Sequence, residues 1–448
     1  MEAQQPVDAS SSSRRSLVVT TVLLALAFTF SYMDRQVLSL LLEPVRHKFS
    51  LTDTEIGMLQ GLSFGAFYAC SGLVLGALVD RYHRVGIAAA CVAAWGLATA
   101  ACGVSGNFVQ LFLSRTGTAI GEAGCSPASY SILSDLTSGR KLLRATAVYH
   151  TGPYIGGGMA LVLGSAALSY FTRAGGMTLP VIGHIDAWQA VFIILGLPGI
   201  LLAAAILLTL REPTRREHGS DVDVSTRATL KFLFSSSQLM RYYAGFVFVT
   251  AGLYVLLAWF PSVMIREGLG SAAEIGHPLG TIFLVIGLAG CLASQVLLRR
   301  LDNRDLLHPL LKRLSIVVAL QIPVTAAFLM ADTAALAYWL YGCEVVTFSA
   351  VTTFMVAPIQ LTVPNRMRGR ATGLFMTFNY LLGASLGPAL VGVLSDRLRG
   401  SHSLLIAFVV VLCVSSACSA LLFYASSRRC ADVRNGDHLR ANAAARNT

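Results

Sequence analysis

The sequence predicts an all-α polytopic membrane protein of twelve spanning helices in two six-helix bundles, and three observations lead to this fold class. Hydrophobic residues make up 55% of the 448 residues, charged residues only 13%, and the mean hydropathy is +0.65. Because soluble proteins carry roughly a quarter charged residues, most of this chain must be solvated by lipid. The hydrophobic residues also form long runs, and Lys and Arg gather in alternate gaps between those runs.

Twelve stretches are long enough to cross a bilayer. A span needs about 20 apolar residues, because about 30 Å of hydrocarbon is crossed at 1.5 Å per residue. The first stretch follows Arg14 and Arg15 and has no small-residue cleavage site after it, so we interpret it as a retained helix. In chain order the predicted spans are 17–42, 55–79, 85–104, 108–134, 144–171, 187–210, 240–265, 275–298, 310–330, 334–360, 370–395 and 402–426.

The loop charges predict the orientation. Loops on the cytoplasmic side of a membrane carry an excess of Lys and Arg. With the N-terminus inside, about 26 of the 34 Lys and Arg fall on the cytoplasmic side and about six on the other. A missed helix would exchange the two sides for every later loop, so the asymmetry supports the count of twelve and two cytoplasmic termini.

The middle of the chain separates two halves that echo each other. Arg144-Ala145-Thr146 and Arg370-Ala371-Thr372 open the fifth and eleventh spans, and a Gly-Pro pair follows inside each. Repeated halves with a binding site between them are a recurrent transporter design. The predicted parts are a disordered tail at 1–16, bundles at 17–210 and 239–427, a cytoplasmic linker at 211–238 and a polar, disordered C-terminal tail at 428–448.

Other function classes find little support. The net charge of +11 does not indicate nucleic-acid binding, because the basic residues lie between apolar runs. The nine Cys show no spacing typical of a disulfide framework or a metal site. The chain has no HExxH, Walker or Ser/His/Asp pattern, so we expect neither an enzyme nor a metal centre. No loop is long enough for a soluble sensor domain.

Few ionisable residues lie inside the predicted spans. Each costs roughly 2.5–3.5 kcal/mol near the bilayer centre, so each needs a partner or a function. Asp34 and Arg115 fall at similar depths in the first and fourth spans, roughly 6 and 9 Å outside the midplane, which permits an ion pair. Glu122 lies two helical turns inward from Arg115 on nearly the same face. Arg35 points away from Asp34, and Glu344 lies near the midplane of the tenth span.

Two interpretations of these charges stay open. Burial raises the pKa of a carboxyl group and a nearby Arg lowers it, so Asp34 and Glu122 can form a proton-coupled switch whose balance changes with conformation. The alternative is a static salt bridge that holds the first bundle together. Arg115 can instead bind an anionic head group. Glu344 serves either substrate binding and gating or an interhelical hydrogen bond.

Three segments suggest gating elements: the loop after the second span and the Gly-Pro pairs of the fifth and eleventh spans. In the loop after the second span, Gly76 permits close helix approach, Asp80 can accept hydrogen bonds from a helix N-terminus, and Arg81 and Arg84 anchor at the surface. Asp135 lies at a depth where it can pair with these arginines.

The Gly-Pro pairs predict bends in the fifth and eleventh spans. Pro153 after Gly152, and Pro388 after Gly387, each remove a backbone hydrogen bond. Such bends serve either rocking of the halves or tight packing.

The loop motif G-x-L-x-D-R-x-x-R at 76–84, with twelve helices and a central linker, resembles the signature of the major facilitator superfamily. Tyr32–Leu38 and Arg115–Ala123, followed by Pro127, are similar to the Spinster branch of that superfamily. The run from Gly152 to Gly157 also resembles the core of the antiporter motif. Val148 replaces the upstream glycine of that motif, which leaves exchange and symport open.

The resemblance implies coupling and cavity roles for Asp34, Arg35, Arg115 and Glu122, and we add the aromatic Tyr254 to the cavity. It also implies alternating access driven by a proton gradient, without a cofactor. The implied substrate is an amphipathic lipid such as a lysophospholipid or a sphingoid phosphate. A carrier or exporter of small organic anions or drugs is the alternative function.

We expect a monomer whose partners are membrane lipids and a small amphipathic substrate. The outward loops are short and contain no N-x-[ST] sequon, which favours a bacterial inner membrane.

Overall fold

The computed structural model describes residues 8–180, 182–215, 226–235, 237–299, 301, 306–363 and 365–446. Residues 1–7, 216–225, 236 and 447–448 of the predicted tails and linker lie outside the described residues.

The first half contains α1 (Asp8–Phe49), α2 (Asp53–Gly57), the π-helix η1 (Met58–Ala66), α3 (Phe67–Arg81), α4 (Arg84–Cys102), α5 (Phe108–Ala123), α6 (Cys125–Leu136), α7 (Gly139–Tyr149), α8 (Gly152–Arg173), the strands β1 (Met177–Leu179) and β2 (Gly183–Ile185), and α9 (Ala187–Thr209). The two strands form a small antiparallel hairpin between α8 and α9. We call the end of the molecule that carries it the hairpin side, and the opposite end, where residues 210–215 leave α9, the linker side.

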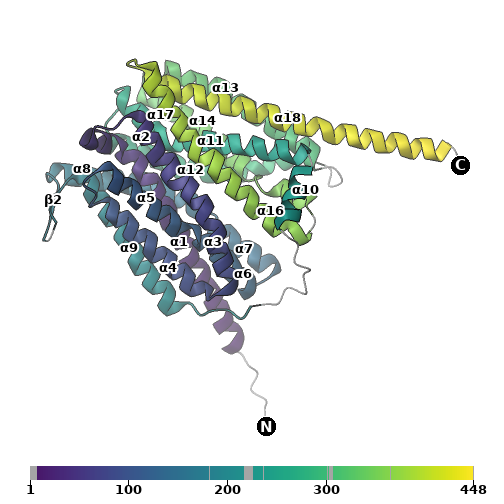
Figure 1. The fold of residues 1–448 in the computed structure, drawn as a ribbon, viewed down its shortest axis with the longest axis horizontal. Coiled ribbons are helices and arrows are strands. Elements are labelled where there is room, and N and C mark those ends of the chain that lie inside the picture. The colour runs from purple at the N-terminus through teal and green to yellow at the C-terminus, as the bar shows by residue number, and fades with distance from the viewer. Residues whose placement is uncertain are drawn as a thin grey trace, which may run out of the picture.

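The second half contains α10 (Thr226–Ser235), α11 (Ser237–Arg266), α12 (Ala272–Leu298), α13 (Leu307–Ala327), the short 3₁₀ helix η2 (Phe328–Met330), α14 (Ala334–Thr352), α15 (Ala357–Thr362), α16 (Asn365–Phe378), the π-helix η3 (Asn379–Ala384), α17 (Ser385–Leu398) and α18 (Ser403–Arg446). Figure 1 shows the helices of each half gathered side by side.

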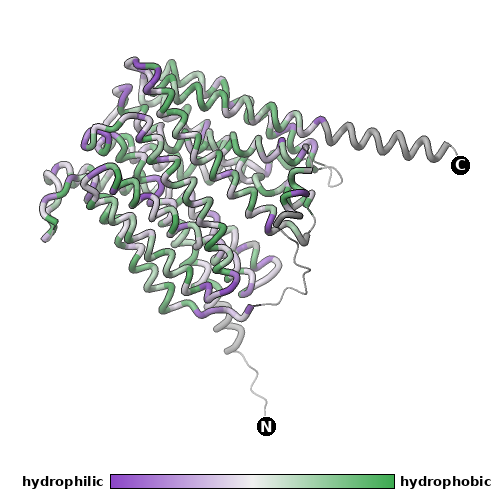
Figure 2. Tube along the Cα trace, in the orientation of Figure 1, coloured by the Kyte–Doolittle hydropathy of each residue, from purple (hydrophilic) through white to green (hydrophobic). Residues whose placement is uncertain are grey.

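Among the described residues, eleven helices are long and apolar enough to cross a membrane. Apolar residues dominate their middles and hydrophilic residues their ends (Figure 2). The predicted fourth span, 108–134, is divided by a turn at Gly124 into α5 and α6, of 16 and 12 residues. Neither piece alone has the length of a span, but together they complete the arrangement of twelve.

Both tails differ from the prediction of disorder. The first helix begins at Asp8, and α18 continues to Arg446. A physical reason is that elongation of an existing helix avoids the cost of nucleation. Ala and Arg, which recur after Arg428, are also strong helix formers.

The two halves meet along three pairs of helices. The first half's α8 packs on α12, η1 and α2 pack on α17, and α1 packs on α11. Glycines allow the closest approaches: a Cβ added to Gly61 of η1 would lie 2.1 Å from the carbonyl oxygen of Ser385, and one added to Gly158 of α8 would lie 2.7 Å from that of Gly280. Only glycine fits at such backbone distances.

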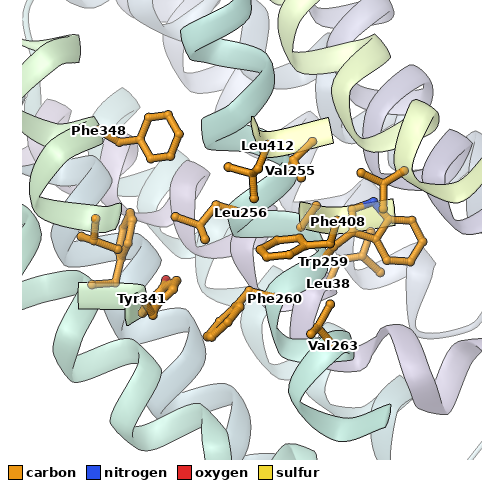
Figure 3. Close-up of a cluster of buried hydrophobic side chains, with 14 of the residues drawn as sticks. Leu38, Val255, Leu256, Trp259, Phe260, Val263, Tyr341, Phe348, Phe408 and Leu412 are labelled. Carbon is orange, nitrogen blue, oxygen red and sulfur yellow. The ribbon is translucent and has the colours of Figure 1, made fainter. Parts of the chain in front are cut away.

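A buried apolar cluster joins the halves near α11. Leu38 of α1 and Val255, Trp259 and Val263 of α11 all belong to this cluster (Figure 3). The indole of Trp259 is fully buried and donates a hydrogen bond of 2.9 Å to the carbonyl of Pro388. This hydrogen bond ties α11 to α17 within the second half, and α1 of the first half packs on the same helix α11.

The π-helices η1 and η3 were not predicted. They contact each other across the interface between the halves. The second one ends at Ala384, four residues before Pro388, where the missing N–H leaves a carbonyl without its helical partner. The predicted bend in this span therefore takes the form of a widened turn before the proline. π-Helical turns often mark functional sites.

Candidate proton and substrate site

Asp34 is 1% exposed in the middle of α1. Its Oδ2 accepts a hydrogen bond of 3.1 Å from the hydroxyl of Thr99 on α4. Arg115, also 1% exposed, donates its Nη1 to the backbone carbonyl of Asp34 at 3.0 Å. The two residues are thus neighbours, as their depths predicted, but their side chains make no ion pair. The second oxygen, Oδ1, has no hydrogen-bond partner among the described residues.

Glu122 is 2% exposed in α5, and its partner is Arg35 rather than Arg115. Its Oε2 accepts hydrogen bonds of 2.6 Å from Arg35 Nε and from the hydroxyl of Ser31. Since Ser31 and Arg35 lie one helical turn apart on α1, their spacing was a signal that the sequence contained.

Three aromatic rings of the first half surround the Arg35 guanidinium. Its central carbon lies 4.7 Å from the ring centroid of Tyr32, 4.4 Å from that of Phe64 and 4.8 Å from that of Tyr68. A cation over ring faces is stabilised by their quadrupoles. The Arg35 side chain is 9% exposed, and its Nη1 has no hydrogen-bond partner among the described residues. The Arg35 guanidinium is therefore an available hydrogen-bond donor among the rings of Tyr32, Phe64 and Tyr68. We call these rings, with those of Tyr254 and Tyr380, the aromatic wall.

The second half closes the wall with two tyrosines. The ring of Tyr380 in η3 lies 4.8 Å from that of Tyr68 and 6.1 Å from that of Tyr254. The predicted cavity residue Tyr254 is half-buried and joins this group through the ring of Tyr380. Tyr380 lies in η3, and Tyr68 lies in α3 two residues after the end of η1. Hydropathy did not single out either ring.

Glu344 lies away from this group. It is fully buried in α14, where Gln321 Nε2 donates to it at 3.0 Å and Thr325 Oγ1 at 2.6 Å, both from α13. This is the interhelical hydrogen bonding that the sequence left open as the alternative. None of these contacts places Glu344 beside Arg35.

We expect Glu344→Gln to leave the melting temperature nearly unchanged, because the amide preserves the shape and an acceptor for Thr325. Glu344→Ala should cost about 2–4 kcal/mol, since it strands two buried polar groups and opens a cavity. Differential scanning fluorimetry of both variants measures this. A fall of similar size for the two variants would contradict the packing role.

The loop motif at the linker side forms an ion-pair cluster within the first half. Arg84 is 1% exposed and pairs with Asp135, as predicted, and also with Glu212 at 2.6 Å. Glu212 accepts the N–H of Val85 at 2.9 Å. Burial raises the pKa of Glu212, but these donors stabilise the carboxylate more, so its pKa lies below the ordinary value. Its contribution to stability is therefore present above about pH 4.3 and is lost as the pH falls through the lower folded value.

Three expectations for this motif need correction. Arg84 does not anchor at the surface, because Asp135 and Glu212 hold it in a buried position. A Cβ added to Gly76 would meet nothing within 4 Å, so no helix approaches closely there, and close approach is provided by glycines such as Gly61 instead. Asp80 contributes its backbone carbonyl, which accepts from Arg215. Arg81 is exposed at the end of α3, as expected for a surface anchor.

The Gly-Pro pairs lie where helices pack closely. Pro153 stands in the first turn of α8, directly after the break that separates α7 from α8. An added Cβ on Gly152 would lie 3.1 Å from the backbone of Thr29, and one on Gly387 would lie 2.7 Å from the carbonyl of Ala251. Both predicted irregularities exist, and tight packing accompanies them.

A charged latch on the hairpin side joins the halves, and the sequence did not reveal it because these charges served only to assign topology. Arg266 of α11 donates to Glu43 of α1 at 2.8 Å and to both oxygens of Asp53 of α2 at 2.7 and 2.8 Å. Asp396 of α17 accepts from the N–H and hydroxyl of Thr54 at 2.8 and 2.6 Å. We call Glu43, Asp53, Arg266 and Asp396 the hairpin latch.

The sequence profile of the Major Facilitator Superfamily matches residues 24–388. An MFS-type efflux pump of Mycolicibacterium smegmatis is 28% identical over 412 residues, which cover 91% of each chain. Protein spinster homolog 1 of Xenopus laevis is 25% identical over 87% of this chain and 74% of its own length. A probable L-galactonate transporter of Escherichia coli is 24% identical over 91% and 89%.

A solved structure has the same fold. It is a bacterial homologue of the human lysosomal transporter Spinster in an inward-facing, unoccupied conformation. The TM-score is 0.77, with 23% identity over 92% of this chain and 97% of that one.

Proposed function

Since the chain belongs to the Major Facilitator Superfamily and is a multi-pass membrane transporter rather than an enzyme, we propose that it carries an amphipathic anion, such as a lysophospholipid or a sphingoid phosphate, by proton-coupled alternating access. The observation that supports this most directly is Arg35, a cation with one free donor inside an aromatic wall and beside a buried acid. The donor suits a phosphate and the rings suit the apolar part of the same molecule.

Arg35 and Glu122 supply the coupling. While Glu122 is ionised it holds Arg35 by a charge-assisted hydrogen bond. A proton on Glu122 weakens that bond, and the guanidinium then takes the anionic head of the substrate. Substrate and proton therefore favour the same state, and by linkage each raises the affinity for the other. Substrate affinity should rise as the pH falls.

Asp34 is the second proton-accepting group of the proposal. It is buried, its Oδ1 is free, and it lies close enough to Glu122 for the two acids to repel each other when both are ionised. Arg115, held on the carbonyl of Asp34, offsets part of that repulsion. The proposed orientation places the linker side in the cytoplasm of a bacterial cell, in accord with the loop charges. The hairpin latch then closes the outer side.

A carrier or exporter of small organic anions or drugs is the second candidate. The efflux pump and the probable L-galactonate transporter among the relatives support it. A sugar acid would use the same Arg35 donor but would leave the rings around it without an apolar partner.

Thermal stabilisation with defined probes separates the candidates. We expect lysophosphatidic acid to raise the melting temperature of the wild type, and a monoacylglycerol of the same chain length to have less effect. Arg35→Gln should remove the stabilisation and Arg35→Lys should restore only part of it, because an ammonium lacks the planar fork. Arg173→Gln, at an exposed Arg on the hairpin side, is the matched control. Stabilisation by galactonate but not by lysophosphatidic acid would favour the second candidate.

A further inference from the structure

Glu122 has no direct route to water in the proposed cycle. The residue is 2% exposed and enclosed by Ser31 and Arg35. A carboxyl group that exchanges a proton in each cycle needs a connection to the solvent of one side.

Two hydroxyl-bearing residues follow Glu122 at intervals of four. Ser126 and Tyr130 lie on α6, beyond the turn at Gly124 and further toward the linker side. Ser126 Oγ lies 3.1 Å from the hydroxyl of Tyr149 on α7. The hydroxyl of Tyr130 lies 2.8 Å from Nε2 of His150. Two pairs of polar side chains thus join α6 to the end of α7 and to the break between α7 and α8.

His150 stands at the end of this row and is exposed. It occupies the turn that separates α7 from α8. The groups packed around its ring are Tyr130 from α6, Tyr149 from α7 and Phe28 from α1, all uncharged near neutral pH. The ring of Tyr130 also lies 5.3 Å from that of Tyr149. The imidazole therefore contacts uncharged aromatic groups of three helices and is exposed at the surface of the molecule.

We propose that His150 is the proton-exchange residue that connects Glu122 to the solvent of the linker side, an inference that rests on the proposed proton coupling. Imidazole is the side chain that titrates between pH 5 and 8 and serves as a proton shuttle. When Nε2 accepts the Tyr130 hydroxyl, the neutral ring carries its hydrogen on Nδ1. A proton that leaves Glu122 reaches Nε2 through the hydroxyls, and the imidazolium releases its Nδ1 proton to solvent water. The ring ends neutral with its hydrogen on Nε2, and one proton has crossed. Exchange of the ring hydrogen with solvent water returns the Nδ1–H tautomer before the next transfer.

The test follows protonation of Glu122 directly, without a transported substrate. Purified protein in lipid nanodiscs receives a photolytic pH jump, and infrared spectroscopy records the carboxylic C=O band that Glu122→Gln eliminates. In His150→Ala this band should respond at least about tenfold more slowly than in the wild type. Added imidazole should restore the rate, because the exposed position admits a free ring. His150→Gln provides a second variant that keeps a partner for Tyr130 without a shuttle.

The controls make the outcomes distinct. His277→Ala, at an exposed His in α12, should leave the rate unchanged. An unchanged rate in both His150 variants would overturn the shuttle while leaving the proposed function standing. Slow exchange that imidazole does not rescue indicates a structural role for the ring and also overturns it. If the wild type shows no titrating Glu122 band between pH 5 and 8, the proton-coupling proposal and this inference both fall.

Discussion

Asp34→Asn should lower proton-driven uptake of a fluorescent lysophospholipid into reconstituted vesicles by at least about 100-fold and abolish its dependence on pH. The amide keeps the size of the carboxyl group and can still accept from Thr99, so the packing of α1 against α4 is preserved. What it loses is the ability to take up a proton on the free Oδ1. The large effect follows because the gradient is then no longer linked to the carrier's conformational equilibrium.

Two controls accompany this measurement. Thr99→Val removes the hydrogen-bond donor but leaves the acid, so uptake should shift its pH dependence without disappearing. Asp332→Asn changes an exposed acid on the hairpin side and should have no effect. If Asp34→Asn transports at the wild-type rate with an unchanged pH profile, the assignment of Asp34 to coupling is wrong, and the static interpretation of these charges is favoured.

The second large effect is expected at the hairpin latch. Arg266 of the second half lies between Glu43 and Asp53 of the first half, and its side chain is 18% exposed. Arg46 of the first half is a more distant partner of the same two carboxylates, at 3.8 and 3.5 Å. Arg266→Gln would remove the cation that the second half supplies to these nearly buried carboxylates and leave them with Arg46. Removing one partner of a buried pair costs about 3–5 kcal/mol. Because the side chain keeps some contact with water, we expect about 3 kcal/mol, which shifts the ratio of latched to unlatched molecules by more than about 100-fold.

Distances between spin labels at His47 and Ser401 report this shift, because both residues are exposed on the hairpin side of opposite halves. In a cysteine-free background, the wild type should give one short distance and Arg266→Gln a longer one. Arg266→Gln combined with Asp53→Asn should recover part of the short population, because one stranded charge is removed. Arg397→Gln changes an exposed Arg of the same side and serves as control. An unaltered distance in Arg266→Gln would show that the latch contributes little.

Hydropathy predicted where the chain crosses the membrane, because a segment is stable in lipid when most of its residues are apolar. It could not predict the turn at Gly124 or the π-helices η1 and η3, since a widened turn changes neither composition nor length. The glycines at intervals of four in η1 were the available sign of close packing.

Depth and rotation explain the outcome for the site residues. Position along a helix gives depth, so Asp34 and Arg115 were correctly placed as neighbours. The direction of a side chain about the helix axis depends on how two helices pack, which the sequence of either helix does not contain. The bond between Arg35 and Glu122 was missed for this reason, and because the length of an Arg side chain exceeds a helical turn. Glu344 was left with two interpretations, and its hydrogen bonds to Gln321 and Thr325 of the preceding long helix, α13, are those that the packing interpretation expects.

The segment 210–215, which follows α9, belongs to the folding unit of the first half. Arg215 donates to the carbonyls of Val79 and Tyr82 at 3.0 and 2.8 Å, and Glu212 binds Arg84 and the N–H of Val85. The segment through Arg215 thus supplies partners for the exposed carbonyls at the end of α3 and the first N–H groups of α4. When the gene is divided so that the halves are made as separate chains, the cut belongs after Arg215, because a cut at Leu210 would deprive one chain of the cap for two of its own helices.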